Sequence, residues 1–225
     1  GLVGSEMCIR DRFGAGFYYK TFMWPAAFWE KLYEPMIRRA AGLGALSGQD
    51  DPSRYDKGYR HCDLLVIGSG PAGLMAALTA GRAGLRVILA EQDFIMGGRL
   101  NAERERIDGM PGAEWAAKAC AELTAMDNVM MMPRTTIYGA YDHGVYGALE
   151  RITDHLNDGE DGDGGDQPRQ ILWRIYSRRA VLAAGSIERP IAFGHNDRPG
   201  IMLAGSVREY ANRYAVCLLY TSDAA

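Results

Sequence analysis

The feature that most limits how this chain can fold is a glycine-rich turn, Gly68-Ser69-Gly70-Pro71-Ala72-Gly73. A G-x-G-x-x-G pattern is weak evidence alone, but here it follows the apolar run 64–67 and precedes a helical pattern over 71–83 that ends at Gly84. The first glycine permits a tight turn, the second lets the backbone approach a phosphate, and the third lets the helix pack against the strand. The helix N-terminus then offers N–H groups and partial positive charge to an anion. The sequence therefore predicts a dinucleotide-binding β-α-β unit from residue 62 to about residue 92.

Two further positions fit the same site. Glu91 ends the second predicted strand, 86–90, where a carboxylate can accept hydrogen bonds from an adenosine ribose and repel a 2′-phosphate. Gly97-Gly98 places adaptable backbone near the turn, and Ala184-Gly185 supplies small residues at the end of a later strand. These features are compatible with either NAD or FAD as the ligand.

The hydrophobic pattern predicts an α/β fold with a Rossmann-like dinucleotide-binding domain, whose parallel sheet carries an antiparallel β-meander. We expect this domain to be incomplete and to follow a short helical segment. The other expected elements are a helix at 113–126, strands at 129–132 and 180–183, meander strands within 135–152 and 170–177, and a helix at 205–215.

The chain before the turn divides into two parts. An aromatic run at 17–24 leads into a helical pattern from about Ala27, which we expect Pro35 to interrupt and Gly42 or Gly44 to close. Residues 45–60 have the composition of a linker. The expected division is therefore 13–60 for this segment with its linker and 61–216 for the dinucleotide-binding domain. The acidic glycine-rich stretch 158–166 lacks the spacing of an EF-hand and is predicted to be a solvated hairpin tip.

Composition excludes several classes of protein. The formal charge of −3 over 225 residues is too small to favour nucleic acid or an anionic membrane as the main partner. No apolar run is long enough to span a bilayer, and the N-terminus lacks the pattern of a signal peptide. The four cysteines show no metal-ligand spacing, which favours a reduced, cytoplasmic setting.

The two ends of the chain are expected to be foreign to the protein. Residues 7–11 (Met-Cys-Ile-Arg-Asp) and 217–221 (Cys-Leu-Leu-Tyr-Thr) can be encoded by DNA strings that are reverse complements of each other. Unrelated protein ends have no reason to show this relation, whereas a sequencing adapter translated at both edges of a read does. Residues 1–12 and 217–225 are therefore left out of the argument about the fold.

The sequence offers no group suited to direct catalysis. The four histidines, at positions 61, 143, 155 and 195, pair with no nucleophile or metal ligand in the sequence. Cys120 falls on an alanine-rich helix and is expected to be a small core residue. Of the arginines at positions 82, 86 and 99, only Arg99 is expected on the pocket side. We therefore predict a cofactor site with no catalytic residue and no metal.

Several longer segments of the chain together resemble one enzyme family. They are the aromatic run 16–25, His61-Cys62-Asp63 before the glycine turn, Gly97-Gly98-Arg99-Leu100, Pro133-Arg134-Thr135-Thr136, residues 184–190 (Ala-Gly-Ser-Ile-Glu-Arg-Pro) and residues 196–200 (Asn-Asp-Arg-Pro-Gly). In these segments the chain resembles the alpha subunit of heterotetrameric sarcosine oxidase, and the resemblance covers residues 13–216.

The resemblance implies a specific function. The family is a bacterial cytoplasmic complex of alpha, beta, gamma and delta subunits that oxidises the small amine sarcosine to glycine. Oxygen is reduced to hydrogen peroxide and the one-carbon unit passes to tetrahydrofolate. FAD would lie in the beta subunit, FMN between alpha and beta, and NAD in the alpha subunit, whose folate domain would lie beyond this chain. The implied NAD contacts are Ala72, Glu91, Gln92, Asp93, Arg99 and a residue near Thr136. Family members often carry Asp-Glu at positions 91–92, and this chain keeps one carboxylate there as Glu91.

Two other functions remain open at this stage. The glycine turn of a self-sufficient FAD-dependent pyridine-nucleotide oxidoreductase would bind FAD instead of NAD. A bound dinucleotide could also be purely structural in a subunit that serves as a scaffold. Complexes that oxidise proline, opines or glycine are built on similar subunits, so the amine substrate is less closely specified than the architecture.

Overall fold

The computed structural model describes residues 24–40, 42, 48, 50–156, 167–196, 198 and 200–216. The predictions for the two chain ends, for most of the aromatic run and for the acidic stretch 158–166 concern residues outside this described part. The chain forms two compact units, one covering Gly1–Asp51 and the other Pro52–Ala225.

The first unit contains a short helical stretch. A 3₁₀ turn, η1 (Ala26–Phe28), runs into a π-helical turn, η2 (Trp29–Tyr33), and then into α3 (Glu34–Ala40). Pro35 is the second residue of α3, and because η2 runs directly into α3, its missing N–H removes one hydrogen bond from the continuous helical stretch. The helical pattern is thus present as predicted, and the α-helical part begins one residue before Pro35. Gly42 follows with φ of +68°, as expected for the end of a helix.

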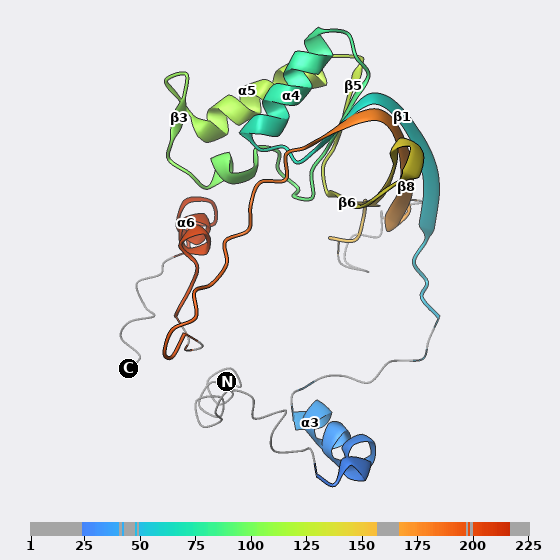
Figure 1. Ribbon diagram of the computed structural model, residues 1–225, viewed down its shortest axis with the longest axis vertical. Helices are drawn as coiled ribbons and strands as arrows, with labels where there is room; N and C mark the ends of the chain where they lie inside the picture. Colours follow the sequence, from blue (N-terminus) through green and yellow to red (C-terminus); the bar gives the residue numbers. More distant parts are fainter. Residues whose placement is uncertain are drawn as a thin grey trace. The chain divides into compact units, whose positions relative to one another are not determined.

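The second unit is built on a six-stranded sheet in the order β5-β2-β1-β8-β7-β6 (Figure 1). Its strands are β1 (Tyr55–Ile67), β2 (Val87–Ala90), β5 (Val129–Met132), β6 (Thr135–Tyr141), β7 (Val145–Arg151) and β8 (Gln170–Leu182). β5, β2, β1 and β8 run parallel, whereas β8, β7 and β6 form an antiparallel meander. The Rossmann-like class with a meander is therefore confirmed.

Two of these strands are longer than the sequence pattern predicted. β1 begins at Tyr55, within the stretch expected to be a linker, and β8 joins the expected strands 170–177 and 180–183 into one. The cause is their mutual pairing, which runs in parallel from Tyr55–Gln170 to Ile67–Leu182. Backbone pairing of this kind does not require apolar side chains, so the polar residues of β1 do not prevent it.

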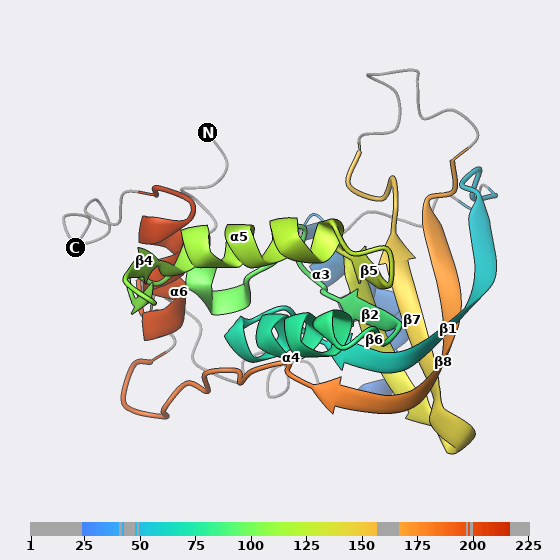
Figure 2. The ribbon, with the colours of Figure 1, turned by 90° about the horizontal axis from the view of Figure 1, so that it is seen from above.

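Helices cover one face of the sheet at the carboxyl-terminal ends of its parallel strands. α4 (Pro71–Arg82) packs over β1 and β2, and α5 (Gly112–Thr124) lies beside α4 and packs against β5 (Figure 2). Val66 and Leu89 pack on this side against Leu74 and Leu123 in one apolar cluster. The opposite, inner side of the curved sheet holds a second cluster of Cys62, Leu65, Ile88, Met132, Ala148, Trp173 and Ile175. This arrangement leaves the carboxyl ends of β1, β2 and β8 together at one edge.

An irregularity in β1 separates its two halves. The N–H groups of Asp63 and Leu64 both donate to the carbonyl oxygen of Arg86, at 2.8 and 3.2 Å, which is the pattern of a β-bulge. Cys62 and Leu65 consequently face the same inner cluster although they are three positions apart. The remaining elements are η3 (Gly98–Asn101), β3 (Arg106–Ile107), β4 (Met110–Pro111), η4 (Asp142–Gly144) and α6 (Ala204–Asn212).

Candidate functional site

The glycine turn connects β1 to α4 and has no room for side chains at two positions. Gly68 has φ of +98°, and a Cβ there would lie 2.5 Å from the carbonyl oxygen of Ala183. A Cβ on Gly73 would overlap the carbonyl oxygen of Gly68. The turn, the start of α4 and the end of β8 therefore touch through backbone, as the roles assigned to the first and third glycines require.

Gly70 differs from Gly68 and Gly73 because the space that its Cβ would occupy is open. A Cβ on Gly70 would meet no atom within 4 Å, and its φ of −61° is accessible to any residue. Gly70 is the N-cap of α4, Pro71 occupies the first turn, and Leu74 donates the first helix hydrogen bond to the Gly70 carbonyl. The N–H groups of Ala72 and Gly73 precede that bond and have no partner within the helix. This open, donor-rich surface suits a pyrophosphate.

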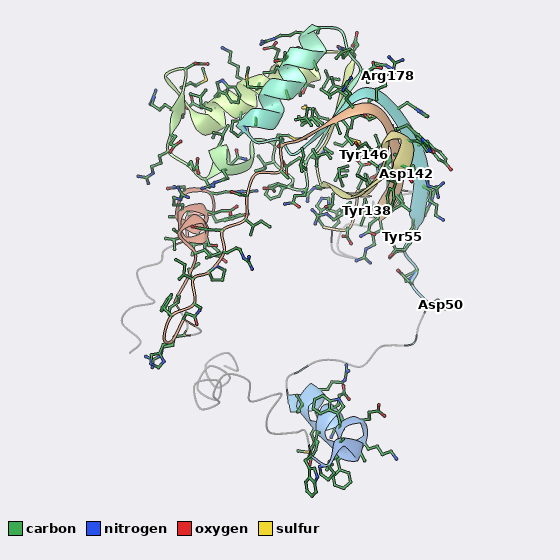
Figure 3. All side chains as sticks on the ribbon, in the orientation of Figure 1. Asp50, Tyr55, Tyr138, Asp142, Tyr146 and Arg178 are labelled. Atoms are coloured by element: carbon green, nitrogen blue, oxygen red, sulfur yellow. The ribbon has the colours of Figure 1, made fainter. Side chains whose placement is uncertain are left out.

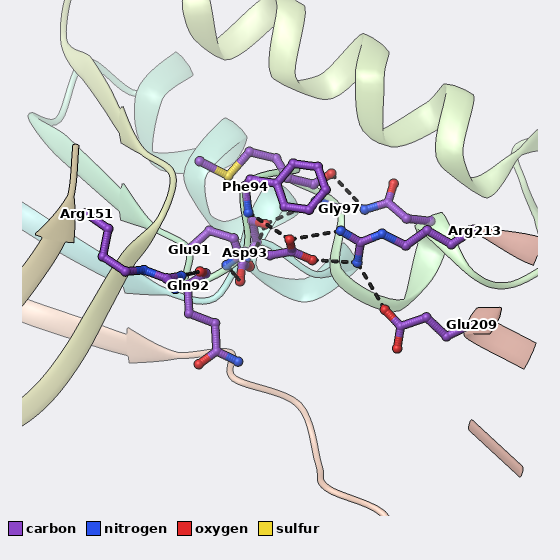
Figure 4. Close-up of polar contacts among 11 residues, drawn as sticks. Glu91, Gln92, Asp93, Phe94, Gly97, Arg151, Glu209 and Arg213 are labelled. Carbon is purple, nitrogen blue, oxygen red and sulfur yellow. Dashed lines mark hydrogen bonds and ion pairs between the residues drawn. The ribbon is translucent and has the colours of Figure 1, made fainter. Parts of the chain in front are cut away.

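Glu91 anchors a buried polar network beside the turn (Figure 4). Its Oε2 accepts hydrogen bonds from the backbone N and the hydroxyl of Ser69, at 2.8 and 2.7 Å, and its Oε1 accepts one from the Asp93 N at 3.0 Å. The Ser69 hydroxyl in turn accepts from the Gly97 N at 3.0 Å. Glu91 is only 8% exposed and Ser69 is fully buried. The carboxylate thus ties the glycine turn to the single loop that follows β2, and its Oε1 retains acceptor capacity for a ribose hydroxyl.

The loop after Glu91 is held from two directions. The Gln92 carbonyl oxygen accepts a 2.6 Å hydrogen bond from Arg151. The Asp93 carboxylate receives both terminal nitrogens of Arg213, at 2.6 and 2.9 Å, and Arg213 also contacts Glu209 of α6 at 3.0 Å. These hydrogen bonds lower the pKa of Asp93 and raise the pKa of Arg213. The predicted NAD contact Asp93 therefore already has a protein partner, and sequence reasoning did not identify Arg213.

The other residues predicted to contact NAD differ in how near they lie to the glycine turn. Gly98 is adjacent, since a Cβ there would be 3.1 Å from the Gly70 Cα. Arg99 forms a 3.0 Å ion pair with Glu103. Thr136 is exposed on β6 next to Thr135, whose N–H donates to the Glu91 carbonyl at 2.7 Å. Ala184 and Gly185 are exposed, and a Cβ on Gly68 would lie 3.1 Å from the Ala184 Cα as well as close to the Ala183 carbonyl.

The thiols and acidic groups offer little direct chemistry. Burial raises the pKa of the Cys62 and Cys120 thiols, which disfavours their nucleophilic thiolate forms. In the described part of the chain, no group of three or more His, Cys, Asp or Glu residues is arranged to hold a metal ion. No helix among the described residues has the length and apolar character needed to cross a membrane.

The chain is similar in sequence to a known protein family and to several known proteins. A family model described as FAD dependent oxidoreductase matches residues 63–154. The sarcosine oxidase subunit alpha of Rhizobium meliloti (strain 1021) is 55% identical over 203 residues, covering 90% of this chain and 20% of the relative. The corresponding subunit of Corynebacterium sp. (strain U-96) is 46% identical over 177 residues, covering 78% of this chain and 18% of the relative. The chain thus spans about a fifth of the length of these relatives, and the resemblance to sarcosine oxidase alpha subunits is confirmed.

A solved structure supports the fold alone. The crystal structure of L-proline dehydrogenase from P. horikoshii superposes with a TM-score of 0.56 at 22% identity, covering 76% of this chain and 32% of that chain. At this identity the likeness shows a shared fold and does not indicate a shared substrate.

Proposed function

We propose that this homologue of sarcosine oxidase alpha subunits is the dinucleotide-binding part of such a subunit, in a multi-subunit oxidoreductase. The observation that carries the proposal is the 55% identity extending over 90% of the chain. The glycine turn supports it independently, because its backbone has the shape and the free donors that a pyrophosphate needs.

The nucleotide proposed for the glycine turn is NAD. Gly68, Gly70, Pro71, Ala72 and Gly73 would surround the pyrophosphate, while Glu91 would accept from the adenosine ribose through its less occupied Oε1. Gln92, Asp93, Gly98, Arg99, Thr136, Ala184 and Gly185 complete the proposed contact set. NAD supplies hydride transfer where it is redox-active. The residues of this chain would bind and orient it, since no catalytic residue is proposed here.

The proposed reaction of the whole complex is the oxidation of the N-methyl group of sarcosine. The products are glycine and hydrogen peroxide, and the one-carbon unit passes to tetrahydrofolate. In this proposal FAD lies in the beta subunit and FMN between alpha and beta. The gamma and delta subunits complete a cytoplasmic heterotetramer.

The test is reconstitution of the full-length subunit with the beta, gamma and delta subunits of the proposed complex. The expected result is hydrogen peroxide formation that depends on sarcosine and exceeds the rate with proline, glycine or an opine. Peroxide formation with one of those other amines alone would reassign the substrate. A well-assembled complex that oxidises none of these amines would overturn the proposed reaction.

A second candidate is a self-sufficient FAD-dependent pyridine-nucleotide oxidoreductase. The observation that favours it is the match of residues 63–154 to the FAD dependent oxidoreductase model. Denaturing the purified full-length subunit and measuring the mass of the released nucleotide distinguishes the two. NAD supports the first proposal, whereas FAD in a yellow subunit purified without partners supports the second.

A further inference from the structure

The outer face of the curved sheet is covered by helices over only half its length. Among the described residues of this unit, no helix covers the face before the bulge at Asp63, where β1 presents Tyr59 and His61 beside Arg174 and Tyr176 of β8. Tyr59 is 58% exposed. Figure 3 shows side chains of this curved part of the sheet, including those of Tyr138 and Arg178.

Aromatic rings lie over this bare face in an ordered array. The ring of Tyr176 stacks on His61 with centroids 5.0 Å apart and on Tyr59 at 6.4 Å, and the Arg174 guanidinium lies 5.8 Å from the Tyr59 ring. On β6 and β7 the array continues, because the ring of Tyr138 lies where a Cβ on Gly147 would be. Tyr138 remains 53% exposed although it contacts the sheet. We call Tyr59, His61, Tyr138, Arg174, Tyr176 and Arg178 the aromatic-basic face.

A pocket opens at one end of the aromatic-basic face. It has a volume of about 400 Å³ and is lined by His61, Cys62, Arg86, His143, Gly144, Tyr176, Ser177 and Arg178. Asp63 lies beside it and is engaged mainly by Arg86, which donates through two side-chain nitrogens and its backbone N–H at 3.1 Å. Arg178 is 3.6 Å from the same carboxylate and its side chain is 82% exposed. Two guanidinium groups thus share one carboxylate, which leaves positive charge at the pocket mouth.

This combination has the character of a protein interface. Tyrosine and arginine are enriched at the energetic centres of interfaces, where stacked rings lose little conformational entropy on binding. The excess of guanidinium groups favours a partner that supplies a carboxylate, because a charge-assisted pair with arginine is stronger and more directional than a neutral hydrogen bond. The chain as a whole carries a charge of −3, which argues against a nucleic acid as the occupant.

We propose that the aromatic-basic face is the docking surface for an acidic segment of another subunit of the complex, with one carboxylate of that segment seated in the pocket beside Arg178. The proposal rests on the proposed function, because it requires a multi-subunit assembly. It assigns a role to a face that is separated along β1 from the glycine turn.

Charge reversal at Arg178 tests the carboxylate contact. In the full-length subunit co-expressed with its partner subunits, Arg178→Glu should weaken association at least about tenfold, since it places like charges together. Arg189→Glu is the matched control, because Arg189 is exposed beyond the carboxyl end of β8 and does not line the pocket. Unchanged association of the Arg178→Glu variant, with wild-type subunits assembling normally, would overturn the proposal. Failure of the wild-type subunits to assemble would instead contradict the proposed function.

Tyr59→Ser provides a second variant that leaves the charge unchanged. We expect several-fold weaker association and normal folding, because the Tyr59 side chain is more exposed than buried. Hydroxyl-radical footprinting then locates the contact, with Tyr59 and Tyr138 reactive in the isolated full-length subunit and protected in the complex. If both tyrosines are protected in the isolated subunit as well as in the complex, the subunit's own chain covers the face. If both are reactive in the complex as well, no partner covers the face. Either result would refute the docking surface.

Discussion

The two halves of β1 use opposite means to present a surface. At the carboxyl end the surface of the glycine turn is defined by the absence of side chains, and the nearby Glu91 carboxylate is buried and hydrogen-bonded. Before the bulge the surface is defined by large side chains that stay exposed, and its charges are unevenly paired. Substitution should therefore be costly to folding at one end and costly only to binding at the other.

Gly73→Ala should have the largest effect on stability. The new Cβ would overlap the Gly68 carbonyl oxygen, and relief requires backbone movement in both the turn and α4. We expect a loss of about 3 kcal/mol or more in the free energy of unfolding, measured by urea denaturation of the full-length subunit. A loss below about 1 kcal/mol would show that the turn can open without cost.

Gly70→Val should separate binding from folding. No atom lies within 4 Å of the Cβ position, so the free energy of unfolding should change by no more than about 1 kcal/mol. The branched side chain would occupy the space proposed for the pyrophosphate. Nucleotide affinity, measured by calorimetry, should fall at least about tenfold, which is about 1.4 kcal/mol of binding free energy. An unchanged affinity would show that the nucleotide does not approach this glycine. Gly70→Ala, which adds only a Cβ, is a smaller change for comparison.

Ser69→Ala should weaken the buried network by an intermediate amount. The variant loses the hydroxyl that donates to Glu91 at 2.7 Å and accepts from Gly97, while the backbone bond from Ser69 to Glu91 remains. The expected cost is about 1–2 kcal/mol of unfolding free energy. Ser186→Ala is the control, since Ser186 is exposed and its loss should cost no more than about 0.5 kcal/mol. Equal costs for the two variants would contradict the importance of burial.

Asp63→Asn should have the smallest effect, and one that depends on pH. Hydrogen bonds from Arg86 lower the pKa of Asp63 from 3.8 to about 2 in the folded protein. Because the folded pKa is depressed, the carboxylate stabilises the fold above the unfolded pKa, and this contribution declines as pH falls below about 4 and is fully lost only below the folded pKa of about 2. The urea midpoint of the wild type should exceed that of the variant at pH 6, and the difference should shrink over that interval. A difference that keeps its full size from pH 6 down to pH 2 would assign the effect to something other than ionisation.

The sequence predicted the parts of the fold whose signals are local. The turn at 68–73, the helix after it and the strand ending at Ala90 each follow from adjacent residues, and all are present. Glu91 was likewise identified as a site residue from its place at a strand end. Its binding to Ser69 could not be predicted, because that contact depends on how two loops approach in space.

Contacts between residues far apart in the chain could not be predicted from the sequence, for a physical reason. Arg213 and Asp93 are separated by 120 positions, and either residue alone reads as an ordinary surface charge. The length of β1 was also underestimated, since its amino half alternates exposed and half-buried residues that resemble a polar linker. Its strand character comes from pairing with β8, and a partner so distant in sequence leaves no local signal.

The length of β1 also sets how strongly its two ends can influence each other. Arg178 lies beside Asp63 of β1, and Asp63 precedes Gly68 by five residues, or about 17 Å at roughly 3.3 Å per residue. Salt at physiological concentration screens exposed charges beyond about 8 Å. A change of charge at Arg178 should therefore be largely screened from a phosphate at Gly70. The strand keeps the two surfaces far enough apart that a change of charge at one end hardly alters the electrostatic potential at the other.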